Sequence, residues 1–318
     1  MKIGLVGLGY WGKNILRNLA SIKNIDIIIC DKDEQLLETY GKKYGATRII
    51  EGYNNFSDML QNKLDAVIIA TNPLATHYNL AKKALEAGVN VWLEKPMTAT
   101  KKEAGELVRL AEKKGLILHV DHTFVYSGPV KQIKRIIDKG ELGNITNVHI
   151  RWLNLGLYQE DMDVIWDLCP HAFSMLNYWF EMTPEEIHKA FPYGDDDAHI
   201  TLDYDSLKGI FQAHIHVSWN YPEKVRECVI VGTKKMLIYD DLKEDKIVVY
   251  NKRVEFSEDE EKPRYVDDGK VVIVFDENEP LLDECKHFIE CVKKGEQTQS
   301  SGRDGAFVIE MLEKTDLR

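Results

Sequence analysis

Three glycines near the start of the chain have the spacing of a dinucleotide-binding loop. Gly7, Gly9 and Gly12 form a G-x-G-x-x-G motif between the apolar run KIGLV and an amphipathic stretch. In such loops the first glycine permits a tight turn, and the second lets the backbone approach a pyrophosphate. The third lets the helix pack closely on the strand, and the helix N-terminus offers N–H groups to the phosphates. The motif therefore predicts a dinucleotide site.

An acidic residue stands where ribose recognition requires one. Asp31 ends the apolar run IDIIIC, 19 residues after Gly12, close to the spacing at which a carboxylate bonds the ribose hydroxyls. A carboxylate there repels a 2′-phosphate, so we expect NAD as the cofactor and regard NADP as the less favoured one.

An aspartate and a histidine four residues apart could do proton chemistry. Asp167 and His171 face the same way if the stretch is helical. Histidine has an unperturbed pKa of about 6.5, so His171 could accept a proton at neutral pH. Asp167 could orient the imidazole or bond a substrate hydroxyl. Because Pro170 lies between them, we place the pair near the first turn of the helix, where proline is tolerated.

Apolar strands alternate with helices through residues 1–121, which we expect to form one domain. Strands that are apolar throughout need cover on both faces, and alternating helices supply it, so the pattern predicts a doubly wound parallel sheet. The predicted strands are 2–7, 25–30, 65–70, 90–95 and 116–120, and the predicted helices are 11–22, 33–44, 75–88 and 101–115.

The pattern changes after about Val120, so we expect a second, α+β domain at 122–318. Period-two alternation with one apolar face predicts an open, mostly antiparallel sheet. The expected strands are 144–154, 198–204, 208–219, 225–232 and 234–241, with helices at 128–140 and near 164–180, 281–294 and 303–315. The acidic run 257–261 is expected to be a solvated loop.

Composition excludes several classes of partner. The 318 residues carry a net charge of −11, which argues against nucleic acid or an anionic membrane surface as the main partner. The five cysteines form no C-x-x-C pair, and no apolar run reaches membrane-spanning length. These features predict a cytoplasmic protein with free thiols.

Three further motifs accompany the glycine loop. They are T-N-P at 71–73, E-K-P at 94–96 and D-x-x-x-H at 167–171. In this order and spacing the motifs closely resemble the Gfo/Idh/MocA oxidoreductase family, along essentially the whole chain. The resemblance implies an N-terminal Rossmann domain, a C-terminal α+β domain, and an NAD(P)-dependent dehydrogenase acting on CH–OH groups.

The resemblance also implies roles for individual residues. Lys95, Asp167 and His171 are expected to be catalytic, with either Lys95 or His171 removing the hydroxyl proton as a hydride passes to nicotinamide. The expected cofactor contacts are Gly7, Gly9, Tyr10, Trp11, Gly12, Asp31, Thr71, Asn72, Pro73, His77, Glu94 and Lys95. The expected substrate contacts are Lys95, Tyr126, Arg151, Asn154, Asp167 and His171. Arg151 and Asn154 share a strand that we expect to face the substrate, where Arg151 could bind a carboxylate or phosphate.

No metal is expected, because His214 and His216 share a strand face without a third ligand at a telling spacing. We expect this face to contact a second subunit in a homodimer or homotetramer, as in many relatives.

Three stretches look like the branch of the family that acts on nucleotide-linked sugars, near the UDP-N-acetylglucosamine and glucosaminuronate 3-dehydrogenases. They are GLGYWGKNILRNL, DVIWDLCPHAFSMLNYWF and VRECVIVGTKKMLIYDD. The chain departs from the usual pattern at Cys169 and Ala172, next to the catalytic candidates. The alternatives are a dehydrogenase of a free sugar or cyclitol, a redox-assisted glycosidase, and a dinucleotide sensor without catalysis.

Overall fold

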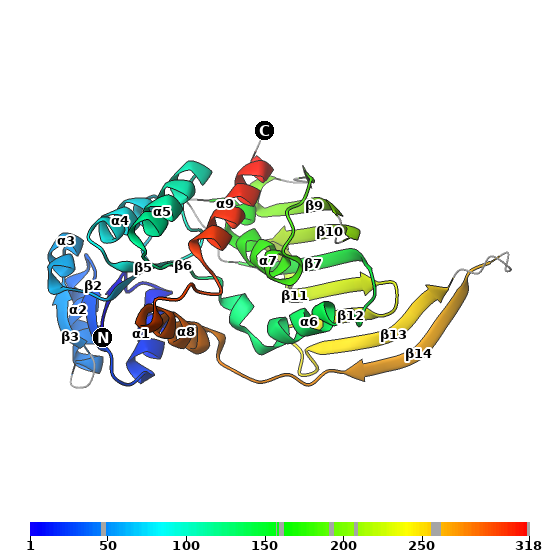
Figure 1. The fold of residues 1–318 in the computed structure, drawn as a ribbon, viewed down its shortest axis with the longest axis horizontal. Coiled ribbons are helices and arrows are strands. Elements are labelled where there is room, and N and C mark those ends of the chain that lie inside the picture. Colours follow the sequence, from blue (N-terminus) through cyan, green and yellow to red (C-terminus); the bar gives the residue numbers. More distant parts are fainter. Residues whose placement is uncertain are drawn as a thin grey trace. The chain divides into compact units, whose positions relative to one another are not determined.

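The computed structural model describes residues 1–45, 49–156, 158, 162–190, 194–206, 209–255 and 262–316. Two compact units make up the chain (Figure 1). The first consists of Met1–Tyr126 and Glu279–Glu313, and the second consists of Ser127–Asn278 and the residues from Lys314 onward. The expected loop at 257–261 lies outside the described residues.

A parallel sheet with strand order β3-β2-β1-β4-β5-β6 forms the centre of the first unit. The strands are β1 (Lys2–Val6), β2 (Asp26–Cys30), β3 (Ile49–Tyr53), β4 (Ala66–Ile69), β5 (Asn90–Leu93) and β6 (Leu118–Val120). Almost every side chain of β1, β2, β4 and β5 is buried, as expected for strands covered on both faces. The predicted Rossmann fold is confirmed. The strand order reverses between β1 and β4, where such sheets bind their ligands.

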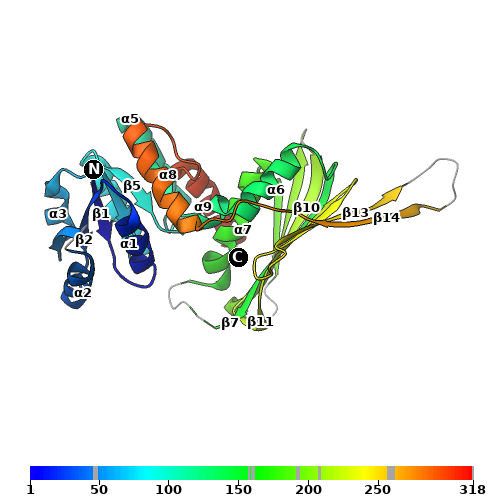
Figure 2. The ribbon, with the colours of Figure 1, turned by 90° about the horizontal axis from the view of Figure 1, so that it is seen from below.

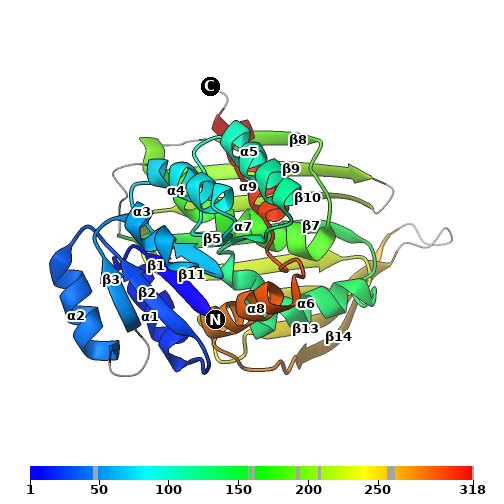
Figure 3. The same cartoon turned by 60° about the vertical axis from the view of Figure 1, so that its left-hand side comes forward.

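Helices flank this sheet (Figure 3). They are α1 (Gly12–Ser21), α2 (Glu34–Tyr44), α3 (Phe56–Met59), α4 (Ala75–Glu86), α5 (Lys101–Lys114), α8 (Pro280–Lys294) and α9 (Gly302–Asp316). Asp33 caps α2 by accepting a hydrogen bond from Gln35 N–H, and Gly115 ends α5 with a φ of +65°.

The last two helices complete the first unit although they follow the second in sequence. Cys285 and Phe288 of α8 are buried in the same core as Leu5 and Leu16. A Cβ on Gly305 of α9 would lie 2.5 Å from a methyl of Val120, so α9 packs directly on β6. The boundary expected at residue 121 assigns both helices to the second domain, whereas their apolar faces are buried against the first.

An eight-stranded sheet forms the second unit, in the order β14-β13-β12-β11-β7-β10-β9-β8. The strands are β7 (Ile145–Leu155), β8 (Glu186–Ala190), β9 (Asp197–Ser206), β10 (Gly209–Ser218), β11 (Asn220–Gly232), β12 (Met236–Asp240), β13 (Ile247–Glu255) and β14 (Arg264–Val272). Its strand pairs are antiparallel except for β7 and β10, which are parallel. The predicted mostly antiparallel sheet is confirmed.

The two faces of this sheet differ. Alternate residues such as Ile150, Ala213 and Cys228 are fully buried and define the inner face, which α6 (Gly128–Asp138) and α7 (Val164–Phe180) cover (Figure 2). The residues between them, including His149 and His214, define the outer face. Along β7 and β10 this alternation agrees with the predicted period of two.

Helix α7 carries the D-x-x-x-H pair, but not entirely in its first turn. Asp163 caps the helix by accepting a hydrogen bond from Trp166 N–H, and Asp167 lies in the first turn. Pro170 lies inside the helix, so the expectation that it falls in the first turn is wrong. The helix begins at Val164, as expected, so Pro170 falls in its second turn, where it has no N–H for the Trp166 carbonyl.

None of the helices in the described ranges is long and apolar enough to cross a membrane.

Candidate active site

The glycine loop joins β1 to α1 at the carboxyl edge of the parallel sheet. Gly7 has a φ of +89°, and a Cβ there would lie 2.3 Å from the Ala70 carbonyl oxygen. A Cβ on Gly12 would lie 1.9 Å from the Gly7 carbonyl oxygen, so the helix can pack on the strand only with glycine at this position. Gly7 and Gly12 therefore shape the loop itself.

Gly9 differs from its two neighbours, because the space beside it is open. A Cβ built there would have no heavy atom within 4 Å, and the residue is exposed. The fold does not require glycine at this point, whereas close approach of a ligand to the backbone does. The N-terminus of α1 agrees, since no side chain caps it and its first turn has no acidic residue. These features fit a pyrophosphate.

Asp31 connects the glycine loop to the end of β2. Its Oδ2 accepts a hydrogen bond from Leu8 N–H at 2.6 Å, and its Oδ1 accepts one from Asp33 N–H at 2.9 Å. The carboxylate is thus fixed beside the loop at the predicted ribose position.

Tyr10 is 73% exposed at the tip of the loop, with the Lys13 ammonium 5.1 Å from its ring centroid.

His77 links the two proline-containing loops. Its Nε2 lies 2.9 Å from the Thr71 carbonyl oxygen, and its Nδ1 lies 3.0 Å from the Pro96 carbonyl oxygen. The Asn72–Pro73 and Lys95–Pro96 peptide bonds are both cis. Burial lowers the pKa of His77, so a neutral ring donates to only one of the two carbonyls. His77, expected to contact the cofactor, is 3% exposed, and its two hydrogen-bond contacts position both loops.

A buried network connects the glycine loop to the E-K-P loop. Trp11 Nε1 donates to Asp121 Oδ2 at 2.9 Å, and Lys95 N–H donates to Glu94 Oε2 at 3.1 Å. Burial raises the pKa of Glu94 well above its usual value, and the negative charge of Asp121 raises it further. Burial also acts to raise the pKa of Asp121, but hydrogen bonds from Glu94, Thr123 and Trp11 outweigh it and lower that pKa. Burial and the charge of Asp121 thus disfavour ionisation of Glu94, whereas these hydrogen bonds favour the charged form of Asp121.

The same network continues behind β6. His119 Nε2 lies 3.0 Å from Glu284 Oε1, and both side chains are fully buried. Burial lowers the pKa of His119 to about 3 and raises that of Glu284 well above its usual value. Burial therefore disfavours the charged form of both groups.

In the second unit, Asp167 is held by an indole. Trp219 follows β10, and its Nε1 donates to Asp167 Oδ2 at 3.1 Å. Asp167 and His171 are both half-buried on α7, four residues apart as predicted. This hydrogen bond restrains the Asp167 carboxylate, one helical turn before His171.

Arg151 and Asn154 lie on opposite faces of β7, three residues apart in a strand with period two. Asn154 is on the inner face, where its Oδ1 accepts from Arg226 Nη2 at 3.1 Å. Arg151 is on the outer face, bonded to Tyr221 at 3.2 Å and Glu227 at 3.5 Å. The expectation that both contact one substrate does not agree with this arrangement.

Arg226 places a cation on the inner face, beside Asn154. Its guanidinium lies 5.6 Å from the Trp152 ring centroid, and burial lowers its pKa while the charge of Asp167 acts in the opposite direction.

Tyr126, another expected substrate contact, is 2% exposed and packs against the rings of His119 and His287. Its position is in the core of the first unit.

Sequence reasoning did not identify Asp121, Trp219 or Arg226. Asp121 directly follows β6, and polar residues at the carboxyl ends of parallel strands are typical of sites, so that signal was available. Arg226 shares one face of β11 with Cys228 and Ile230, so a charged residue occupies a position in a period-two pattern that is otherwise apolar. No local pattern distinguishes Trp219.

The fold and the glycine loop define a Rossmann-type dinucleotide-binding protein. The chain matches two sequence profiles of one family. Residues 1–122 match the oxidoreductase family with an NAD-binding Rossmann fold, and residues 130–238 match the GFO/IDH/MocA C-terminal domain. The chain therefore belongs to the Gfo/Idh/MocA oxidoreductase family. The predictions of this family, and of an NAD-binding oxidoreductase, are confirmed.

Relatives by sequence and by structure differ in the substrates that their names state. An inositol 2-dehydrogenase of Salmonella typhimurium is 26% identical over 60% of this chain and 58% of its own length, so the match spans less than two-thirds of that relative. The UDP-N-acetylglucosamine 3-dehydrogenase GnnA of Acidithiobacillus ferrooxidans has a TM-score of 0.80, at 20% identity over 100% of this chain and 96% of that one. The WlbA dehydrogenase of Bordetella pertussis, crystallised with NADH and UDP-GlcNAcA, has a TM-score of 0.77, at 19% identity over 99% and 94%. At this identity the structures show a shared fold.

Proposed function

We propose that this protein is an NAD-dependent dehydrogenase that oxidises a hydroxyl-bearing carbon of a sugar or cyclitol, with a nucleotide-linked sugar oxidised at C3 as the preferred substrate. The observation that carries the proposal is the restrained Asp167 on α7, bonded to Trp219 and followed one turn later by His171. A proton-accepting pair of this kind in an NAD-binding family is suited to alcohol oxidation.

The chain's own residues position and deprotonate the substrate. Bound nicotinamide supplies the hydride acceptor. Lys95, on the E-K-P loop, bonds the reacting hydroxyl, and either Lys95 or His171 accepts its proton. Asp167, restrained by Trp219, bonds a neighbouring hydroxyl or orients the His171 imidazole. Among the expected cofactor contacts, we propose that the glycine loop, Asp31, Thr71 to Pro73 and Lys95 bind the dinucleotide, with His77 holding two of these loops in place.

Arg226 supports a substrate that carries negative charge. Its guanidinium is partly buried near Asp167, and Nη1 donates to the Leu153 and Val225 carbonyls while Nη2 donates to Asn154. The Nε side of the group is therefore the part that could bind a phosphate or carboxylate. Arg151, on the outer face, is no longer part of the proposed substrate site. The folds shared with GnnA and WlbA agree with a nucleotide sugar, and the Salmonella relative agrees with a cyclitol.

Substitutions of the two proton acceptors test the reaction. We expect Lys95→Ala and His171→Ala each to lower kcat by about 100-fold or more, since positioned general bases contribute about 10²–10⁴-fold. Lys101→Ala and His188→Ala are matched controls at exposed positions and should retain activity. Unchanged turnover in both catalytic variants would eliminate the assignment.

A substrate panel separates the classes. NAD reduction is followed with UDP-, dTDP- and GDP-sugars, free sugars and inositols, in the wild type and in Arg226→Gln. A nucleotide sugar should give the highest kcat/KM, and Arg226→Gln should raise KM for that substrate alone. An inositol as the best substrate, with no effect of Arg226→Gln, would establish the cyclitol alternative. Cofactor that stays bound without net reduction, while a glycosidic bond is cleaved, would establish the glycosidase.

Association into a homodimer or homotetramer stays a prediction. Sedimentation velocity of the purified chain tests it, and a single monomeric species would contradict it.

A further inference from the structure

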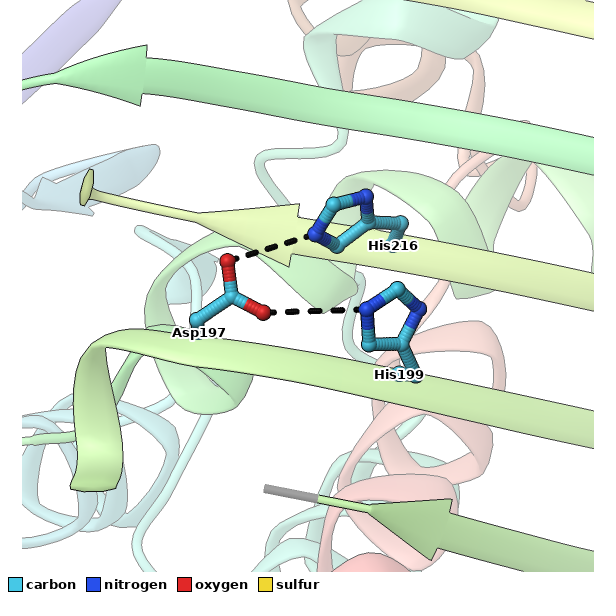
Figure 4. A group of neighbouring side chains, drawn as sticks. All are labelled: Asp197, His199 and His216. Atoms are coloured by element: carbon cyan, nitrogen blue, oxygen red, sulfur yellow. Dashed lines mark hydrogen bonds and ion pairs between the residues drawn. The ribbon is translucent and has the colours of Figure 1, made fainter. Parts of the chain in front are cut away.

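Three potential metal ligands meet on the outer face of the eight-stranded sheet, on the two neighbouring strands β9 and β10. His199 pairs directly with His216 across the strands, and Asp197 lies two residues before His199, so all three side chains project from one face. Figure 4 shows both imidazoles directed towards the Asp197 carboxylate.

The distances between the donor atoms suit one bound ion. Asp197 Oδ2 lies 3.3 Å from His216 Nε2, and Asp197 Oδ1 lies 3.7 Å from His199 Nε2. One donor atom from each residue lies within 4.8 Å of the other two. Metal–nitrogen and metal–oxygen bonds of about 2.1 Å place neighbouring tetrahedral donors about 3.4 Å apart. Asp197 is hydrogen-bonded to His216, whereas its contact with His199 exceeds hydrogen-bonding distance.

The two imidazoles lie almost parallel and close together. The rings of His199 and His216 are stacked with centroids 4.0 Å apart and an interplanar angle of 18°. Arg151 adds a positive charge to this face, but its guanidinium bonds Glu227 and Tyr221, and the Glu227 carboxylate offsets that charge.

We infer that Asp197, His199 and His216 bind one divalent transition-metal ion, with solvent in the remaining coordination positions. A set of two imidazoles and one carboxylate binds Zn²⁺ and its first-row neighbours in preference to Mg²⁺ or Ca²⁺. In the single chain the His199 side chain is 54% exposed, and those of Asp197 and His216 are each 22% exposed. Because we also expect this face to contact a second subunit, the bound ion would lie within or beside that contact. The site is separate from Asp167 and Arg226, which lie on the inner-face side of the same sheet.

The same face contains two internal controls. Glu186, His188 and Asp203 also form a group within 4.8 Å, but it has only one imidazole, and His188 is 59% exposed. His214, two residues before His216, has its Nδ1 3.1 Å from the Thr201 hydroxyl and stacks on His149. Substitutions of His188 and His214 therefore change exposed or half-buried histidines without touching the proposed ligands.

The experiment uses tag-free, EDTA-treated protein titrated with ZnCl₂ by calorimetry and with CoCl₂ by visible absorption. We expect one Zn²⁺ per chain and a cobalt spectrum without sulfur charge-transfer bands, since all five cysteines are buried. His199→Ala and His216→Ala should each weaken Zn²⁺ binding about 100-fold or more, because even the loss of a residue supporting a ligand costs about 10–100-fold. His188→Ala and His214→Ala should bind as the wild type does.

Three results would overturn the inference: no saturable binding near one equivalent, unchanged affinity in His199→Ala, or loss of binding in His188→Ala. Asp197→Asn, which preserves the size of the side chain, gives a third ligand variant if an alanine variant fails to fold. Melting curves without metal establish that each variant compared is folded. Because the readouts are stoichiometry and cobalt absorption, failure of the proposed dehydrogenase activity leaves this test unaffected.

Discussion

Substituting Gly9 by alanine separates the requirements of the fold from those of the cofactor. The new methyl has no heavy atom within 4 Å, and the φ of Gly9 lies outside the left-handed region, so the native loop accepts it without strain. Alanine also restricts the unfolded chain, which stabilises a compatible site by about 0.4–1 kcal/mol. The melting temperature should stay the same or rise by up to about 4 °C.

Binding should respond in the opposite direction. The methyl would occupy the space through which a pyrophosphate approaches the loop, and overpacking of this kind costs about 1–3 kcal/mol. We therefore expect the Kd for NADH to rise about 5- to 150-fold, at about 1.4 kcal/mol for each tenfold change. The assay is a titration that follows nicotinamide fluorescence, combined with thermal unfolding of the same samples.

Two other glycines serve as controls. Gly41 in α2 also has no heavy atom within 4 Å of a built Cβ, so Gly41→Ala should stabilise the protein and leave NADH affinity unchanged. Gly12→Ala should lose stability, because its Cβ would lie 1.9 Å from a backbone oxygen. If Gly9→Ala remains folded and binds NADH within twofold of the wild type, the loop does not approach the pyrophosphate as argued.

Three further predictions concern charge and proton binding. Asp31→Asn should shift the NADP-to-NAD affinity ratio about tenfold or more towards NADP, because it removes repulsion of the 2′-phosphate; direct titrations with both cofactors measure this, and an unchanged ratio would contradict it. Burial lowers the pKa of His122 to about 4 in the folded protein, below its unfolded value, so its stabilising contribution is present above about pH 6.5 and is lost as the pH falls towards 4. His122→Asn should therefore make the decline in unfolding free energy between pH 6 and 4 shallower by about 1.4 kcal/mol per pH unit, as measured by urea unfolding, and an equally steep decline would refute the assignment. Trp219→Phe keeps an aromatic side chain but removes the hydrogen bond to Asp167. Because a hydrogen bond to a charged group contributes about 1.5–3 kcal/mol, kcat should fall at least about tenfold and its pH profile should change. Kinetics identical to those of the wild type would show that this hydrogen bond has no role.

Local periodicity was sufficient to predict much of the fold. The strands β1, β2, β4 and β5 are short apolar runs bounded by glycine, proline or polar residues, so their type and approximate limits follow from neighbouring residues alone. Strand β14 shows why local periodicity did not predict every strand. Its residues are almost all exposed, so no apolar face marks it, and pairing with β13 defines it as a strand.

The sequence by itself determined the dinucleotide loop, because G-x-G-x-x-G, its strand, its helix and Asp31 all lie within about 30 residues of one another. It also determined the Asp167–His171 pair, since a spacing of four is a property of one helix.

Only the tertiary structure decided which distant residues join these local motifs. Sheet register placed His199 beside His216 and assigned Arg226, rather than Arg151, to the face of Asn154. Long-range packing buried Glu284 against His119, 165 residues away, and this burial raises the pKa of the Glu284 carboxyl. The physical reason is that side-chain periodicity repeats every two or four residues and can be read locally. Strand register and burial depend instead on segments that meet only when the chain folds.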